Sequence, residues 1–101
     1  MIYITQLIYV REGQEDVFQG FEDSVLPLME TYGGHMLLRL RPSDDSVVAR
    51  QGDKPYEVHV ITFPDDAALA GFSHDERRKA FLHLKEASVK SVLLVRGEAI
   101  G

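Results

Sequence analysis

Four segments of the sequence have the composition of β-strands, and their apolar residues fall on both faces of the strand. These segments are rich in Ile, Val, Leu and Tyr and span residues 2–10, 35–41, 56–63 and 91–100. In the first, Ile4 and Ile8 fall on one face and Leu7 on the other. A strand with one face in water alternates apolar and polar residues instead. The sheet is therefore expected to be covered on both sides.

The second of these segments, HMLLRLR, alternates more clearly than the others. Strict alternation places Met36, Leu38 and Leu40 on one face and Arg39 and Arg41 on the other. The basic face points either to water or to an anionic group in a cleft. Charged residues on an edge strand discourage mispairing, and this is the role expected of Arg41.

The segment between the first two strands has helical periodicity. Its apolar residues form one stripe: Val17, Phe18, Phe21, Val25, Leu28, Met29 and Tyr32. Pro27 falls off this stripe and is expected to bend the helix. The glycine pair Gly33-Gly34 is expected to end it.

A second helical region follows the third strand. It opens with a short helix in PDDAALAGF, residues 64–72. Ser73 and Glu76 then have the spacing of a capping box, which predicts a further helix through about Glu86. The loop between the second and third strands, residues 42–55, is long and rich in turn formers, so it is expected to be the most mobile internal segment.

The resulting order, β-α-β-β-α-β, predicts a ferredoxin-like α+β fold. In this fold a four-stranded antiparallel sheet, with strand order 4-1-3-2, carries both helices on one face. The chain has 101 residues, which suits a single domain over residues 1–101. Because the helices cover one face only, we expect a second copy to cover the other by two-fold symmetry. The alternative is a monomer with a large exposed apolar face, which is uncommon.

The composition of the chain limits which binding partners and which cellular compartment are expected. The net charge of −5 argues against nucleic acid as a partner, because phosphate binding needs a basic surface. The absence of cysteine excludes disulfides and thiolate chemistry and fits a reducing compartment. The N-terminal residues lack the features of a signal peptide, and no apolar run approaches the roughly 18 residues of a membrane span. A cytoplasmic protein without membrane contact is expected.

Three stretches of the sequence resemble a known superfamily. They are YGGHMLLR (32–39), ITFPDDAALAGF (61–72) and LLVRGEA (93–99). With the predicted strand order, they resemble the dimeric α+β barrel superfamily, and most closely a small uncharacterised bacterial family within it. The superfamily includes antibiotic-biosynthesis monooxygenase-like proteins, stress-responsive barrel proteins and muconolactone isomerases. This resemblance implies a homodimeric barrel and a cofactor-independent monooxygenase- or isomerase-like activity on a small aromatic or enolic substrate.

Four residues are candidates for a ligand site between sheet and helices. His59 is the candidate proton-transfer group, because imidazole titrates near neutral pH. Arg39 is the candidate to hold an anionic or enol oxygen. Tyr3 and Phe72 are candidates for the walls. The alternative interpretation pairs Arg39 with a carboxylate such as Glu57 and buries His59 as a packing residue.

No spacing in the sequence indicates a metal or a cofactor. The four histidines lack the helical spacing of a zinc motif, and no glycine-rich phosphate loop is present. The charged run DERRKAFLHLKE is expected to be a solvated helix face. Three functions stay open: a small-molecule enzyme, a non-catalytic ligand-binding or stress-associated dimer, and a structural dimer with a vestigial pocket. An apolar pocket with converging polar groups would favour the first two.

Overall fold

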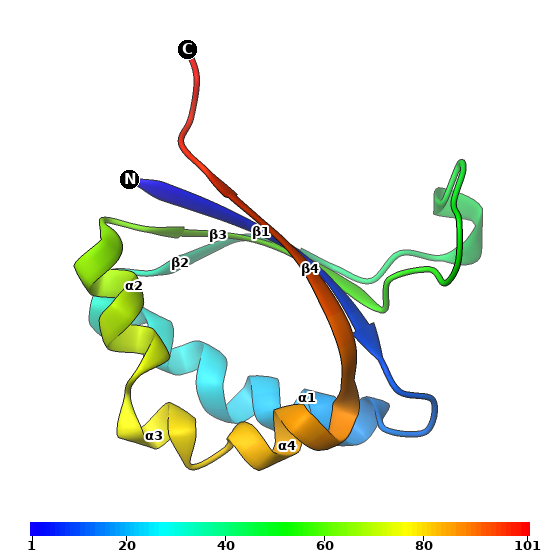
Figure 1. The fold of residues 1–101 in the computed structure, drawn as a ribbon, viewed down its shortest axis with the longest axis horizontal. Helices are drawn as coiled ribbons and strands as arrows, with labels where there is room; N and C mark the ends of the chain where they lie inside the picture. The colour runs from blue at the N-terminus through cyan, green and yellow to red at the C-terminus, as the bar shows by residue number, and fades with distance from the viewer.

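The computed structural model describes residues 1–101 and has the predicted order of elements (Figure 1). The strands are β1 (Ile2–Val10), β2 (His35–Leu40), β3 (Glu57–Phe63) and β4 (Val89–Gly97). The α-helices are α1 (Glu15–Val25), α2 (Asp66–Ser73), α3 (Glu76–Lys79) and α4 (Leu82–Ser88). Two 3₁₀ helices are η1 (Leu26–Tyr32) and η2 (Asp44–Ser46). None of the helices is long and apolar enough to span a membrane.

The four strands form one antiparallel sheet in the order β2-β3-β1-β4, which confirms the ferredoxin-like prediction. The four α-helices and η1 lie below this sheet, and the loop of residues 42–55, which contains η2, projects from the opposite end of the molecule from α2 (Figure 1). Apart from the single turn of η2, this loop has no regular structure and pairs with no strand. The sheet therefore has a helix-covered face and an open face.

The two helical regions are more broken than the sequence predicted. The first is α-helical only to Val25 and continues as η1, with Pro27 in the first turn of that 3₁₀ helix, because proline has no N–H to extend the α-helical hydrogen bonds. Gly33 then ends it with φ of 73°. The capping box at Ser73 was wrong: Ser73 ends α2, and the Asp75 carboxylate caps α3 by accepting from the Arg77 N–H. One expected helix is instead α3 and α4.

A bulge at Leu37 changes the faces of β2. Pairing with β3 shifts by one residue between Met36 and Leu38, so strict alternation fails there. Met36 lies opposite Ile61 on the helix-covered face, while Arg39 lies opposite His59 on that same face. The predicted grouping of Met36 with Leu38 and Leu40 was therefore wrong at its first member.

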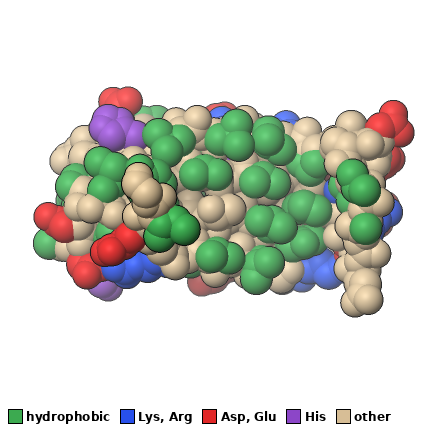
Figure 2. Space-filling model, turned by 90° about the horizontal axis from the view of Figure 1, so that it is seen from above, with side chains coloured by type: hydrophobic (Ala, Val, Ile, Leu, Met, Phe, Trp, Pro, Cys, Tyr) green, Lys and Arg blue, Asp and Glu red, His purple; other side chains and the backbone are tan.

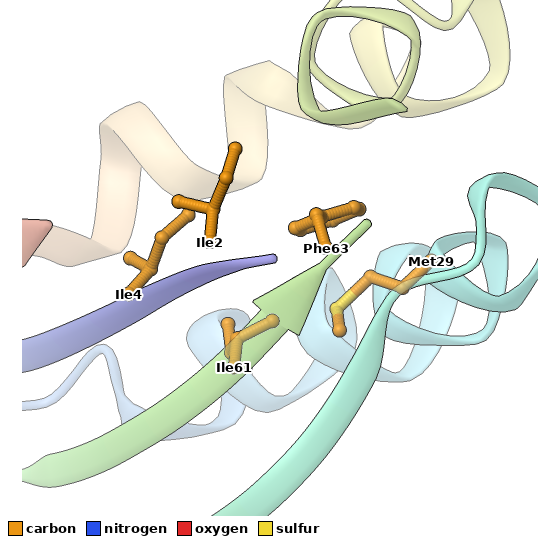
Figure 3. Close-up of a cluster of buried hydrophobic side chains, with 5 residues drawn as sticks. All are labelled: Ile2, Ile4, Met29, Ile61 and Phe63. Atoms are coloured by element: carbon orange, nitrogen blue, oxygen red, sulfur yellow. The ribbon is translucent and has the colours of Figure 1, made fainter. Parts of the chain in front are cut away.

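The core lies between the sheet and η1. It is built from Ile2, Ile4, Met29, Ile61 and Phe63, all buried (Figure 3). The helix-covered face therefore carries the tightest packing at the end where β1, β3 and η1 meet.

The open face of the sheet is apolar and uncovered. Its side chains, which we call the open apolar face, are Leu7, Leu38, Leu40, Val58, Val60, Leu93 and Val95. Leu93 and Val95 are 55% and 56% exposed. Hydrophobic side chains gather across this side of the molecule (Figure 2). Contiguous apolar surface of this kind marks an interaction site.

Gly34 offers a test of the core packing. A Cβ at this position would lie 2.7 Å from the Phe63 ring and 3.1 Å from the carbonyl oxygen of Met29. Because backbone and a buried ring cannot move away cheaply, Gly34→Ala should lower the free energy of unfolding by about 1–3 kcal/mol in urea titrations.

Gly20→Ala is the matched control. It lies inside α1, and an added Cβ meets nothing within 4 Å. The same change should leave stability unchanged or raise it by up to about 1 kcal/mol, since alanine favours helix over glycine. Equal stability of Gly34→Ala and the wild type would contradict the packing described here.

Candidate functional site

Three ionisable side chains meet beneath the sheet and are almost fully buried. Glu57 and His59 both point from β3 to the helix-covered face, and Glu22 meets them from the buried face of α1. His59 Nε2 lies 2.5 Å from Glu57 Oε2 and 2.9 Å from Glu22 Oε2. Their exposed fractions are 1–2%. We call these three residues the acid–histidine cluster.

Two arginines pair with the carboxylates of the cluster: Arg39 of β2, and Arg41, which follows the end of β2. Arg39 Nη2 lies 2.8 Å from Glu22 Oε1, and its Nε lies 3.3 Å from Glu57 Oε2. Arg41 Nε lies 2.9 Å from Glu57 Oε1, and its guanidinium sits over the ring of Tyr56. The basic face of β2 therefore meets carboxylates of its own chain. Arg41 lies at the edge of the sheet, as expected, and also pairs with Glu57.

The surroundings move the pKa values of the cluster in different directions. Burial raises the pKa of Glu22, and the neighbouring Glu57 adds to this effect. Burial alone would raise the pKa of Glu57 as well, but hydrogen bonds from Glu22, His59 and Arg41 lower it to about 2. Arg41 pairs with Glu57 and not with Glu22, which helps to separate the two glutamates.

The pKa of His59 is raised. Burial on its own disfavours the imidazolium, but hydrogen bonds to Glu22 and Glu57 outweigh burial. Glu57 is thus the permanent anion of the cluster, while Glu22 and His59 both hold a proton more strongly than usual. A buried pair of this kind suits proton transfer.

The cluster has metal-binding residue types, but its charges favour another role. One ligand atom from each of Glu22, Glu57 and His59 lies within 4.8 Å of the others. However, Arg39 and Arg41 already pair with oxygens of both carboxylates. A divalent cation would add charge beside two guanidinium groups. The donor set is therefore better matched to holding protons than to holding a metal.

A cavity of about 200 Å³ opens beside the cluster, between the helix-covered face of the sheet and the helices. Eleven of its sixteen lining residues are hydrophobic, including the rings of Phe18, Phe21 and Phe72. The polar residues in the lining include Glu22 and His59. This is the form of a small-molecule site, apolar with a few convergent polar groups.

Two cations also line the cavity from the helical side. Arg78 lies on α3 and Lys85 on α4. The guanidinium of Arg78 lies 5.3 Å from the centre of the Phe72 ring, and its Nη1 donates to the Ser73 carbonyl oxygen. Neither cation has an ion-pair partner in the chain. The charged run was thus not entirely the solvated face that the sequence predicted.

The structure brings together two of the four candidates from the sequence. His59 and Phe72 line the cavity. Arg39 shares their face of the sheet but pairs with Glu22 and Glu57 outside the lining, as the alternative interpretation proposed. Tyr3 lies on the opposite face, beside Thr62 and Gly97, and does not reach the cavity.

Three residues of the site were missed from the sequence: Glu22, Arg78 and Lys85. Glu22 carried a signal, because it lies four residues after Phe18 and three before Val25, within the apolar stripe of α1. Arg78 and Lys85 are seven residues apart, a spacing that returns to one face of a helical region. Because Arg78 and Lys85 lie within a run of charged residues, their position on one face did not stand out in the sequence.

Comparison with known proteins agrees with the predicted fold. No protein-family model and no curated protein matches the sequence. A protein of unknown function from Rhodopseudomonas palustris superposes with a TM-score of 0.86 at 16% identity, covering 99% of this chain and 82% of that chain. An antibiotic biosynthesis monooxygenase superposes with a TM-score of 0.71 at 16% identity, covering 100% of both chains.

A third structure has the same topology. It is a dimeric ferredoxin-like protein of unknown function from Jannaschia sp. CCS1, with a TM-score of 0.71 and 17% identity, covering 97% of this chain and 98% of that chain. At these identities the likeness shows the fold. The chain has the ferredoxin-like α+β fold that its sequence predicted.

The raised pKa of His59 predicts a pH dependence of stability. The imidazole gains its partners only on folding, so its contribution is complete below the ordinary pKa of 6.5 and is lost as pH rises through the folded-state pKa. The free energy of unfolding of the wild type should therefore fall above pH 6.5. Urea titrations at several pH values measure this fall.

Substitution separates His59 from the other histidines. His59→Gln should lose the decline that begins at pH 6.5, whereas the raised pKa of Glu22 contributes a decline that begins near pH 4.5. His83, which is exposed and unpaired, provides the control, and His83→Gln should keep the wild-type profile. A wild-type profile in His59→Gln would show that the cluster does not hold this proton.

Proposed function

We propose that this protein is a small-molecule enzyme of the cofactor-independent monooxygenase or isomerase kind, which moves a proton on an aromatic or enolic substrate bound in the cavity. The observation that carries the proposal is the acid–histidine cluster in the wall of an apolar cavity. Both reaction kinds share a first step in which a C–H or O–H bond breaks and an enolate or phenolate forms. Reprotonation at another carbon then gives isomerisation. Monooxygenation instead uses O₂ as a co-substrate: one oxygen atom enters the substrate, the other leaves as water, and the substrate itself is the reductant.

The geometry of His59 supports this role. Its Nε2 is held by Glu57 and Glu22, while its Nδ1 is buried and has no hydrogen-bond partner. When Nε2 carries the proton, Nδ1 has a free lone pair that can accept one from the substrate. The two carboxyls then stabilise the imidazolium that forms, as a carboxylate does in hydrolytic triads.

The cavity supports the class of substrate. Its aromatic walls suit a planar apolar body, and its polar groups are few. A protein described as an antibiotic biosynthesis monooxygenase shares the fold, and this likeness supports a monooxygenase-like activity. The non-catalytic alternative, a ligand-binding dimer, needs the same cavity but no proton transfer.

Hydrogen–deuterium exchange tests the proposal directly. The protein is incubated in D₂O with a panel of single-ring phenols and small enolisable ketones, and loss of the C–H signals is followed by ¹H NMR. We expect catalysed exchange for at least one compound of the panel. His59→Gln should slow it by about 100-fold or more, because a positioned general base contributes at least that much.

The exchange experiment has a control variant and an outcome that would favour the ligand-binding alternative. His83→Gln should exchange at the wild-type rate, because His83 is exposed and lies outside the cavity. Saturable binding of panel members with no catalysed exchange would instead support the ligand-binding alternative.

The proposal includes a homodimer that joins two open apolar faces. Support comes from the exposure of Leu93 and Val95 on a sheet that no element of the same chain covers. A second copy provides a surface of the same apolar character through two-fold symmetry. The Jannaschia protein, which is described as dimeric, has the same topology.

Sedimentation velocity tests the dimer. The wild type should sediment as a dimer at micromolar concentration, and Leu93→Asp should shift it to monomer, because a carboxylate in the centre of the interface would be buried without a partner. Val48→Asp is the control, since Val48 is 100% exposed in the loop of residues 42–55. A monomeric wild type would overturn this assembly.

A further inference from the structure

Arg78 and Lys85 differ from every other cation of the chain. Of the eleven lysines and arginines, seven pair with a carboxylate of the same chain. Arg11 and Arg50 have no such partner and are exposed to water. Arg78 and Lys85 alone are both shielded from water and unpaired, and both line the cavity.

An unpaired, shielded cation is costly unless an anion comes to it. Removing a charge from water is unfavourable, and a nearby opposite charge offsets that cost. The Nε of Arg78 is buried with no acceptor at all. Burial lowers the pKa of both groups, and repulsion from Arg78 lowers that of Lys85 further. These two side chains therefore form a positive site that the chain itself leaves unfilled.

We propose that Arg78 and Lys85 bind the carboxylate of a substrate whose body is a single ring or an enolisable group of similar size. The ring or enolisable group in this proposal depends on the function proposed above. The carboxylate is inferred from the two cations alone. The two oxygens of a carboxylate match the paired N–H groups of a guanidinium, and an ammonium can donate to either oxygen.

The size of the cavity suits a ligand with one ring. An apolar cavity of about 150 Å³ holds benzene. The cavity of about 200 Å³ therefore has space for one ring and a short acidic substituent. Phe18, Phe21 and Phe72 supply apolar contacts for that ring.

The placement of charges orients the ligand. The cations come from α3 and α4, whereas the acid–histidine cluster comes from α1 and β3. A carboxylate held by Arg78 and Lys85 stays away from the anionic Glu57, which would repel it. The remainder of the ring is then presented to His59.

Calorimetric binding of an acid and its neutral analogue tests the proposal. Phenylacetate and phenylacetamide have the same shape and differ in charge. The wild type should bind phenylacetate about tenfold tighter or more, because charge-assisted hydrogen bonds are worth that much. Arg78→Gln and Lys85→Gln should each reduce this preference and leave the binding of phenylacetamide unchanged. Near-UV circular dichroism checks that each variant is folded.

Controls of the same residue types lie outside the cavity. Arg50→Gln and Lys79→Gln change exposed residues and should keep the wild-type preference for the acid. Equal affinity of the wild type for phenylacetate and phenylacetamide would overturn the proposal. So would an unchanged preference in both cavity variants, or no binding of either compound at millimolar concentration.

The two proposals fail in different ways. Tight binding of phenylacetate without deuterium exchange on any compound would leave the carboxylate site standing and overturn the enzyme. Deuterium exchange on neutral phenols, with no preference for phenylacetate over phenylacetamide, would support the enzyme and overturn the carboxylate site.

Discussion

The ion network of Glu22, Glu57, His59, Arg39 and Arg41, buried at its two glutamates and His59, ties together the parts of the structure that define the site. It joins α1 to β3 and β3 to the edge strand β2. Buried charges of this kind gain little net stability over apolar packing, but breaking one pair leaves an uncompensated charge and is strongly destabilising. The network therefore fixes how α1 sits against the sheet, and with it one wall of the cavity.

The strand order and the doubly apolar strands were predictable because they depend on local pattern. Residues 2–10 and 56–63 carry apolar residues on both faces, and the β-α-β-β-α-β order leaves few topologies. Of the proposed site residues, His59 and Phe72 line the cavity. Tyr3 does not, because it lies on the open face of β1, and the face of a strand residue follows from register.

The site residues that were not predicted from the sequence owe their positions to contacts between distant elements. Glu22 looked like an exception in an apolar stripe, and only the approach of β3 gives it partners. Arg78 and Lys85 have the spacing of one face, but the break between α3 and α4 decides that both reach the cavity. A pattern read along one helix cannot show which neighbours will neutralise its charges.

The bulge at Leu37 decides which surface of the protein is ionic. With regular pairing after His35, Arg39 and Arg41 would point to the open apolar face, and Leu38 and Leu40 would point to the helices. The extra residue reverses this arrangement. One backbone irregularity thus places the charged side chains of β2 on the helix-covered face and its leucines on the open apolar face. A gain or loss of one residue at this point of the chain would therefore mix the two, which makes β2 the strand least tolerant of length variation.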